Sequence, residues 1–286
     1  MPYATTSDSV RLYYEEAGSG TPIVFVHEFA GDHRNWEPQM RYFARMHRCI
    51  AYAARGYKPS DVPPDPKSYS YKHWASDVCA VLDHLKIDKA HIVGLSMGGY
   101  TTAVMGFMFP QRARSLTIAG AGSGSIPSRM EEMRKGWRQI ADDFEKKGTP
   151  EVVKGYGMSP QRIAYMLKDP RGFEEFNRMF AEHDSKGSAN TMRGFQCERP
   201  PIYDFEAQFK TITVPALIVV GDEDDPCLEP SVFMKRVIPT SGLVVMPKTG
   251  HVVNQEEPAL FNQVVADFIA RVEAGRWPTR DPRSVG

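Results

Sequence analysis

Short apolar runs alternate along the chain with longer segments that have helical periodicity. The runs are too short to be helices, and they are typical of strands buried on both faces of a parallel sheet. The predicted strands are residues 23–26, 49–53, 91–94, 116–119, 216–220 and 243–246. Helical spacing occurs between them, for example at 74–85 and, after Pro258, at 260–272. The alternation predicts an α/β fold with helices on both faces of a mostly parallel sheet.

The first residues follow a different pattern, because Val10, Leu12 and Tyr14 alternate with other side chains before a glycine-rich turn at 18–20. A period of two is typical of a half-buried strand. We therefore expect an antiparallel hairpin at the edge of the sheet.

A long interruption of the alternation covers residues 122–208, where helical patterns occur without an apolar strand run. This segment is rich in methionine and aromatic residues, including Trp137. Such side chains adapt to irregular apolar surfaces, so we expect a helical cap over a pocket, although most of them would pack within the cap's own helices. The core would then be residues 1–121 and 209–275, followed by a loose tail at 276–286.

The chain has 286 residues, with 35 Lys and Arg balanced by 35 Asp and Glu. Without a basic excess it lacks the attraction that nucleic acids and anionic membranes need, so a small-molecule partner is expected. The composition is also compatible with a homodimer. The absence of an evident leader or membrane-spanning run predicts a cytoplasmic protein. The cysteines are far apart and are expected to be reduced and structural: Cys49, Cys79, Cys197 and Cys227.

The sequence Gly94-Leu-Ser96-Met-Gly98 lies between the predicted strand 91–94 and a predicted helix at 100–109. In this context a G-x-S-x-G turn holds a serine hydroxyl above the sheet, at a helix N-terminus whose free N–H groups stabilise negative charge. Because the turn is tight, bulky side chains two positions to either side would collide. Ser96 is therefore predicted to be a nucleophile.

A serine nucleophile needs a base, and the base needs an acid that orients it. His251 follows the last predicted strand and so lies at the sheet edge where α/β folds bind ligands. The other histidines are expected to be structural. Asp224 and Asp225 both follow the end of the strand at 216–220, and either could be the acid.

Ser96, the acid loop and His251, in this order, resemble the α/β-hydrolase superfamily over almost the whole chain. His27 after its strand and the Arg-Gly pair at 55–56 add to the resemblance. It implies an eight-stranded sheet with a helical cap, and its G-x-x-D pattern favours Asp224 as the acid. The most similar branches are small-molecule esterases, enol-lactonases, perhydrolases and carbon–carbon bond hydrolases.

The resemblance places the oxyanion donors at the backbone N–H groups of Phe29 and Met97. Relatives usually have His-Gly where this chain has His27-Glu28. A carboxylate about 4 Å from the oxyanion would oppose it by roughly 4 kcal/mol at an effective dielectric of about 20. We therefore predict that Glu28 points away or is neutral, and we prefer a structural hydrogen bond to nearby backbone. Contact with a polar or cationic substrate group is the alternative.

These features predict a serine hydrolase that cleaves a small ester or lactone through an acyl-enzyme on Ser96. Glu28 and Trp137 are candidate substrate contacts. A carbon–carbon bond hydrolase of a vinylogous diketone is one alternative, although Leu95 stands where such enzymes commonly have Asn. A receptor-like protein of the same fold with little turnover is another. The glycine and histidine spacing predicts neither a nucleotide cofactor nor a metal.

Overall fold

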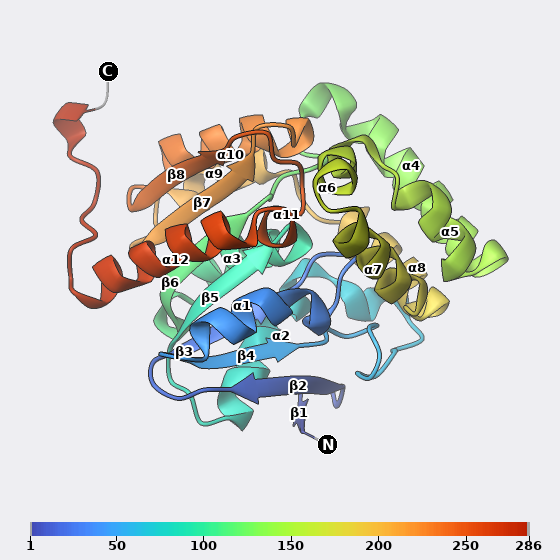
Figure 1. Ribbon diagram of the computed structural model, residues 1–286, viewed down its shortest axis with the longest axis horizontal. Helices are drawn as coiled ribbons and strands as arrows, with labels where there is room; N and C mark the ends of the chain where they lie inside the picture. The colour runs from blue at the N-terminus through green and yellow to red at the C-terminus, as the bar shows by residue number, and fades with distance from the viewer. Residues whose placement is uncertain (1, 285–286) are drawn as a thin grey trace.

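The computed structural model describes residues 2–284, and its core is one sheet of eight strands (Figure 1). The strands are β1 (Tyr3–Thr5), β2 (Arg11–Ala17), β3 (Pro22–Val26), β4 (Arg48–Tyr52), β5 (Ala90–Leu95), β6 (Ala113–Ala119), β7 (Ala216–Gly221) and β8 (Ser241–Met246). Their order across the sheet is β1-β2-β4-β3-β5-β6-β7-β8. The β1–β2 and β2–β4 pairs are antiparallel, whereas the other neighbours are parallel. The predicted α/β fold with a mostly parallel sheet and an antiparallel edge is confirmed.

Burial along the strands follows their place in the sheet. The central strands β5 and β7 are buried along their whole length, as continuous apolar runs between two helix layers should be. The last strand differs from the expectation of a fully buried run. β8 lies at the edge and pairs only with β7, so most of its side chains keep some exposure, and Val245 is 43% exposed.

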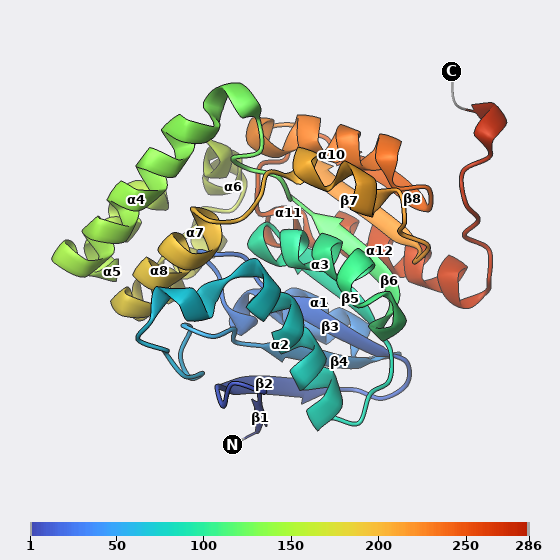
Figure 2. The same cartoon turned by 180° about the vertical axis from the view of Figure 1, so that it is seen from behind.

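Helices cover both faces of the sheet. On the face that Figure 1 shows in front lie α1 (Glu37–Phe43) and α12 (Pro258–Glu273). The opposite face, which Figure 2 shows, is covered by α2 (Tyr71–His84), α3 (Met97–Met108) and α10 (Asp225–Val237). Two short helices lie in connections: α9 (Glu206–Phe209) precedes β7, and α11 (Val253–Glu256) precedes α12. The helix expected at 100–109 begins earlier, directly after Ser96.

The segment between β6 and β7 is helical. It contains α4 (Met130–Lys147), α5 (Thr149–Tyr156), α6 (Ile163–Lys168), α7 (Pro170–Ala181) and α8 (Ser185–Thr191). These helices gather at one side of the sheet in both views (Figures 1 and 2). Aromatic rings hold them together, since the Phe180 ring lies 6.3 Å from that of Phe144 and 5.6 Å from that of Tyr156. We call residues 122–208 the cap; its limits as a domain stay a prediction.

The C-terminal tail is more firmly attached than expected. Trp277 donates a hydrogen bond from Nε1 to the C=O of Thr240 at 2.7 Å, and its ring lies 4.6 Å from that of Phe268. The expectation of a loose tail at 276–286 is therefore wrong for its first residues, because an indole finds both an apolar face and an acceptor there. Residues 285–286 lie outside the described part of the chain.

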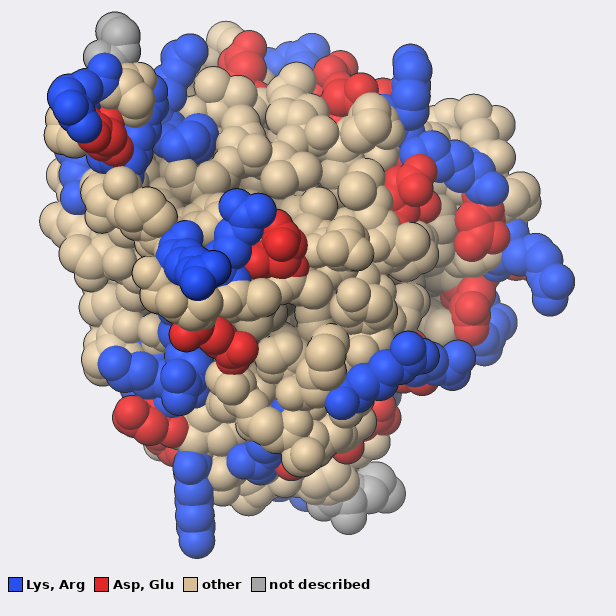
Figure 3. All heavy atoms as spheres, turned by 60° about the vertical axis from the view of Figure 1, so that its left-hand side comes forward, with Lys and Arg blue, Asp and Glu red and all other residues tan. Residues whose placement is uncertain are grey.

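Charged side chains of both signs are interspersed on the face shown in Figure 3. Some of them pair along helices, as Glu37 and Arg41 do on α1. Within residues 2–284, no helix combines the length and the apolar character that crossing a membrane requires.

Candidate active site

The serine turn has the strained geometry that its glycine pattern predicts. Ser96 links β5 to α3 with φ of 55° and ψ of −111°, a conformation that L residues rarely adopt. A Cβ on Gly98 would lie 2.0 Å from the carbonyl oxygen of Val26, and a Cβ on Gly94 would lie 2.1 Å from that of Gly98. Only glycine at these two positions lets the turn pack this closely against β3.

A hydrogen-bonded chain runs from the serine through a histidine to a carboxylate. The Oγ of Ser96 lies 2.8 Å from Nε2 of His251, and Nδ1 of the same ring lies 2.7 Å from Oδ2 of Asp224. If Nδ1 donates its proton to the carboxylate, Nε2 is free to accept from the hydroxyl. Asp224 and His251 are buried, whereas Ser96 keeps part of its surface exposed. The arrangement can remove a proton from a reachable hydroxyl.

The acid loop has two neighbouring aspartates in different environments. Asp224 is fully buried against His251, whereas Asp225 is exposed at the start of α10. Residue spacing leaves the choice between the two aspartates open. In the structure, Asp224 is the one that contacts His251. Its catalytic role stays a prediction.

The loop that carries His251 is held from two sides. The His251 N–H donates to the C=O of Gln161 in the cap at 2.9 Å. The preceding N–H, that of Gly250, donates to both carboxylate oxygens of Glu256, at 3.0 and 2.9 Å. Burial raises the pKa of Glu256. The position of the imidazole thus depends on the cap as well as on the core.

One predicted oxyanion donor, Met97, lies in the serine turn, and the other, Phe29, follows β3, whose end contacts that turn at Gly98. Met97 is the first residue of α3, so its N–H has no acceptor inside the helix. Within residues 2–284, neither this N–H nor that of Phe29 has a protein acceptor at hydrogen-bond distance. The turn before Phe29 is shaped by His27, whose Nδ1 lies 2.6 Å from the C=O of Glu28 and whose Nε2 accepts from the N–H of Ala54 at 3.0 Å. Both amides can donate to a bound group.

Glu28 has a partner that the sequence interpretation did not anticipate. Its Oε2 accepts a short, charge-assisted hydrogen bond from Nη2 of Arg162, and both side chains are almost fully buried. The preferred expectation of a bond to nearby backbone is therefore wrong, because the partner is a cation from the cap. Arg162 also lies over the rings of Tyr156 and Phe176, with 5.4 Å from its Cζ to each ring centroid. Because Arg162 offsets the charge of Glu28, this carboxylate would repel a nearby oxyanion much less than an unpaired one would.

Trp137, a predicted substrate contact, lies on α4 and is 9% exposed. A Cβ on Gly124 would lie 2.1 Å from Cη2 of its indole, so the ring packs tightly on the loop after β6. Its ring also faces the guanidinium of Arg199, whose Cζ lies 5.5 Å from the ring centroid. Neither Arg162 nor Arg199 was found by sequence reasoning, which had no signal to separate them from the other arginines of the cap.

Cys227 lies beside the acid and the imidazole. Its thiol donates to the C=O of Gly120 at 3.2 Å and lies 4.0 Å from Nδ1 of His251, and burial raises its pKa well above the ordinary value. Together with Asp224 these atoms are close enough to surround a metal ion. They fit one poorly, because the thiol is held protonated and the imidazole nitrogen is already bound to the carboxylate.

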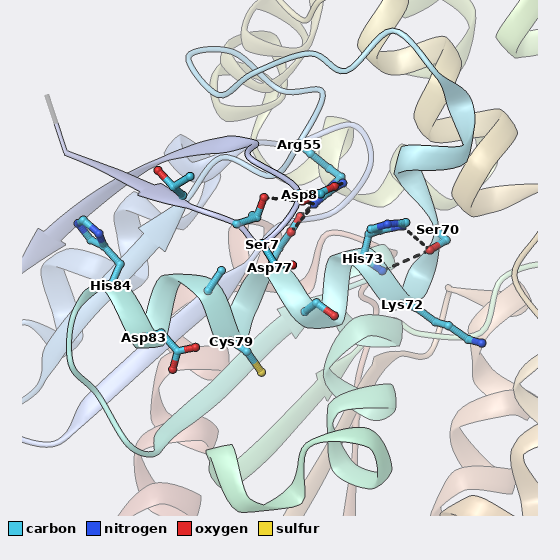
Figure 4. A pocket seen from close by; sticks show the side chains of 14 residues that line it. Ser7, Asp8, Arg55, Ser70, Lys72, His73, Asp77, Cys79, Asp83 and His84 are labelled. Carbon is cyan, nitrogen blue, oxygen red and sulfur yellow. Dashed lines mark hydrogen bonds and ion pairs between the residues drawn. The ribbon is translucent and has the colours of Figure 1, made fainter.

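Arg55, from the Arg-Gly pair that contributed to the family resemblance, lines a separate hollow, shown in Figure 4. The guanidinium of Arg55 binds Asp77 through two hydrogen bonds of 2.7 Å and also binds Asp8. The hollow has a volume of about 650 Å³, and neither Ser96 nor His251 lines it. Arg55 therefore ties the start of the chain to α2 rather than contributing to the site.

Comparison with known proteins shows what the whole chain is similar to. A family model described as the alpha/beta hydrolase fold matches residues 21–258. The 3-oxoadipate enol-lactonase 1 of Acinetobacter baylyi is 26% identical over 252 residues, which cover 88% of this chain and 89% of that protein. An esterase from Thermogutta terrifontis is 25% identical with a TM-score of 0.85, over 95% of this chain and 98% of that one.

A third similarity concerns the fold alone. The enol-lactonase from Burkholderia xenovorans LB400 is 23% identical with a TM-score of 0.82, over 94% of this chain and 100% of that one. Since the family model spans well over half of the residues, the chain belongs to the alpha/beta hydrolase fold family.

Proposed function

We propose that this protein is a serine hydrolase that cleaves a small carboxylic ester or lactone through an acyl-enzyme on Ser96. The observation that carries the proposal is the continuous hydrogen-bonded chain from Ser96 through His251 to Asp224. The names of the Thermogutta terrifontis esterase and of the Acinetobacter baylyi enol-lactonase, to which the chain is similar, support this class of substrate.

In this mechanism His251 takes the proton of Ser96 as its Oγ attacks the substrate carbonyl carbon. The carbonyl π electrons move to the oxygen, and the N–H groups of Phe29 and Met97 stabilise the oxyanion. His251 then gives its proton to the departing alkoxide, which leaves the acyl-enzyme. Water attacks the acyl carbon by the same steps, releasing the carboxylic acid and restoring Ser96.

The surroundings favour the charges that this reaction creates. Asp224 stabilises the imidazolium that forms when His251 accepts a proton, because it is buried and joined to Nδ1. Arg162 neutralises Glu28 next to the donor at Phe29, so that the oxyanion meets little net repulsion from this carboxylate. The strained backbone of Ser96 keeps its Oγ at the helix N-terminus, where the first N–H groups are free.

Replacing Ser96 with Ala tests the proposal. Hydrolysis of a para-nitrophenyl ester should fall by about a thousandfold or more, and labelling by a fluorophosphonate probe should disappear, with the circular dichroism spectrum unchanged. Ser7→Ala, at an exposed position, is the matched control and should behave as the wild type. Near-full activity, or undiminished labelling, of the Ser96 variant would refute the role of this residue.

Two alternatives are separated by the substrates used. Faster cleavage of ring-cleavage dienones than of aryl esters would indicate a carbon–carbon bond hydrolase using the same residues. Tight ligand binding without product and without probe labelling would indicate a receptor-like protein.

A further inference from the structure

The buried arginines of this chain differ in how their charge is balanced. Among residues 2–284 the buried arginines are Arg55 and Arg162, each 1% exposed, and Arg199, which is 7% exposed. Arg55 pairs with Asp77, and Arg162 pairs with Glu28. Arg199 forms no ion pair with any carboxylate in that part of the chain. A buried charge without an opposite charge is costly, so its retention calls for an explanation.

In the described part of the chain, the groups that contact the guanidinium of Arg199 are neutral. Its Nη2 donates to the C=O of Ser123 at 2.7 Å. Three aromatic rings lie around it, with 4.9, 5.5 and 5.7 Å from its Cζ to the centroids of Tyr100, Trp137 and Phe195. Aromatic faces attract a cation, but less strongly than a carboxylate does. Burial lowers the pKa of Arg199, which is the direction expected where no anion offsets the loss of water.

The guanidinium also has unused donors. Arginine has five N–H donors in a planar fork, and among residues 2–284 only Nη2 of Arg199 has a protein acceptor. Nε of Arg162 is sealed from solvent without a partner, whereas the free nitrogens of Arg199 are not sealed in this way. The unpaired nitrogens therefore keep some contact with solvent, which a ligand carboxylate would replace.

Arg199 is positioned by residues that adjoin the serine site. Tyr100 lies one turn after Ser96 on α3, and its N–H donates to the Ser96 carbonyl at 2.7 Å. Ser123 lies in the loop that leaves β6, next to the strand end where Ala119 accepts the Ser96 N–H at 2.8 Å. The cation thus lies at the same edge of the sheet as the nucleophile, between the core and α4 of the cap.

We propose that Arg199 is the binding site for a carboxylate carried by the substrate, so that the natural substrate is an anionic ester or lactone. A carboxylate matches the planar fork of a guanidinium with two parallel hydrogen bonds. It would also supply the negative charge that the described residues do not provide to Arg199. The aromatic rings hold the side chain in place before the substrate arrives, which reduces the entropy lost on binding. This inference rests on the proposed serine hydrolase and narrows its substrate class.

A purely structural role is the competing explanation, in which the three rings alone account for Arg199. The two explanations differ in whether substrate charge matters. A paired set of substrates tests this: the para-nitrophenyl half-esters of glutarate, adipate and pimelate, and the same esters with a carboxamide in place of the free carboxylate. The quantity compared is the ratio of kcat/KM for the anionic ester to that for the neutral one, after subtraction of the uncatalysed rate.

The wild-type ratio should be about ten to one hundred for the best chain length, as a charge-assisted hydrogen bond pair predicts. Arg199→Met should reduce the ratio to about one, and Arg199→Lys should retain part of it because the charge remains but the fork is lost. Arg138→Met is the matched control, since Arg138 is exposed on cap helix α4, and it should keep the wild-type ratio. A wild-type ratio of one or less, or an unchanged ratio in Arg199→Met, would overturn the inference.

Free glutarate identifies the source of the anion and separates this inference from the proposed hydrolase. It should inhibit the wild type competitively and bind far more weakly to Arg199→Met in calorimetry. Non-competitive inhibition would mean a separate anion site and would overturn the substrate assignment. If no ester is cleaved at all, the hydrolase proposal fails, yet Arg199-dependent glutarate binding would still support the anion site. Ester cleavage without charge preference would refute the anion site alone.

Discussion

Replacing Glu28 with Gln removes the negative charge from the buried pair that joins the oxyanion turn to the cap. The two side chains are 2% and 1% exposed, so Arg162 would be left as a buried cation facing a neutral amide. Glutamine keeps the shape and an oxygen acceptor. The substitution therefore isolates the charge of Glu28 from its packing.

The expected loss of stability follows from the burial of the pair. Two unit charges about 3 Å apart attract by about 5.5 kcal/mol at an effective dielectric of about 20. The amide oxygen retains a hydrogen bond worth about 1 to 1.5 kcal/mol, and the rings of Tyr156 and Phe176 continue to attract the cation. We expect Glu28→Gln to lower the free energy of unfolding by about 3 to 4 kcal/mol, within the range for breaking a buried ion pair.

The same change should slow catalysis. Phe29, whose N–H is the proposed oxyanion donor, directly follows Glu28, and loss of one such donor costs about a hundredfold to a thousandfold in kcat. Because the backbone turn is also held by the His27 ring, we expect a partial effect of about tenfold in kcat. The lower kcat should also be measured with neutral esters, because the ion pair of Glu28 and Arg162 holds the backbone turn and not the substrate.

Urea unfolding followed by circular dichroism, and kcat for a neutral aryl ester, measure the two effects. Glu37→Gln on α1 is the matched control, because its carboxylate is 51% exposed and pairs with Arg41 on the surface. The double variant Glu28→Met, Arg162→Met should recover much of the lost stability, since it removes both charges. A free energy of unfolding within about 0.5 kcal/mol of the wild type, together with an unchanged kcat, would show that the charge of Glu28 holds neither the cap nor the turn.

Two further predictions concern backbone crowding and pH. Gly98→Ala should destabilise the protein by several kcal/mol or prevent folding, because its Cβ would lie 2.0 Å from a backbone carbonyl oxygen. Gly136→Ala is the control: its Cβ would meet nothing within 4 Å, so it should stabilise α4 by about 0.5 to 1 kcal/mol. Equal melting temperatures of the two variants would contradict this prediction. Burial lowers the pKa of His27 to about 4. Between about pH 6.5 and 4, this imidazole is therefore protonated in the unfolded chain but neutral in the folded one. As the pH falls through this range, the free energy of unfolding should decrease by up to about 1.4 kcal/mol per pH unit because of this group. The slope of unfolding free energy against pH should be smaller in His27→Gln by that amount, and an unchanged slope would count against a buried neutral imidazole.

Features that depend on short-range patterns could be predicted from the sequence. The strands and the serine turn belong to this group, because continuous apolar runs can be buried only inside the sheet and because the glycines around Ser96 prevent a backbone clash. His251 and Asp224 could be chosen because the ends of parallel strands meet at one edge of the sheet. Their hydrogen bonds to each other are seen in the structure, while their catalytic roles remain to be tested.

Features that depend on the placement of the cap could not be predicted. Glu28 needed a counter-charge, but its partner lies 134 residues away in a segment whose helices give no indication of how they sit on the core. Arg199 looked like any other cap arginine, because burial without an acid is a property of three-dimensional surroundings. Trp277 likewise lies in an Arg- and Pro-rich stretch whose composition favours a loose tail, and only its contacts with Thr240 and Phe268 show otherwise.

The cap is part of the framework of the site and not only a cover. Gln161 and Arg162 are adjacent in one short turn, yet the first accepts the backbone N–H of His251 and the second pairs with Glu28. These two partners follow β8 and β3, which are separated in the sheet by β5, β6 and β7. One cap turn therefore spans the strand end that carries Ser96, and it fixes the proposed base and the proposed oxyanion donor relative to each other. This explains why a carboxylate can be tolerated beside the proposed oxyanion donor: its charge holds the cap turn that links both sides of the site.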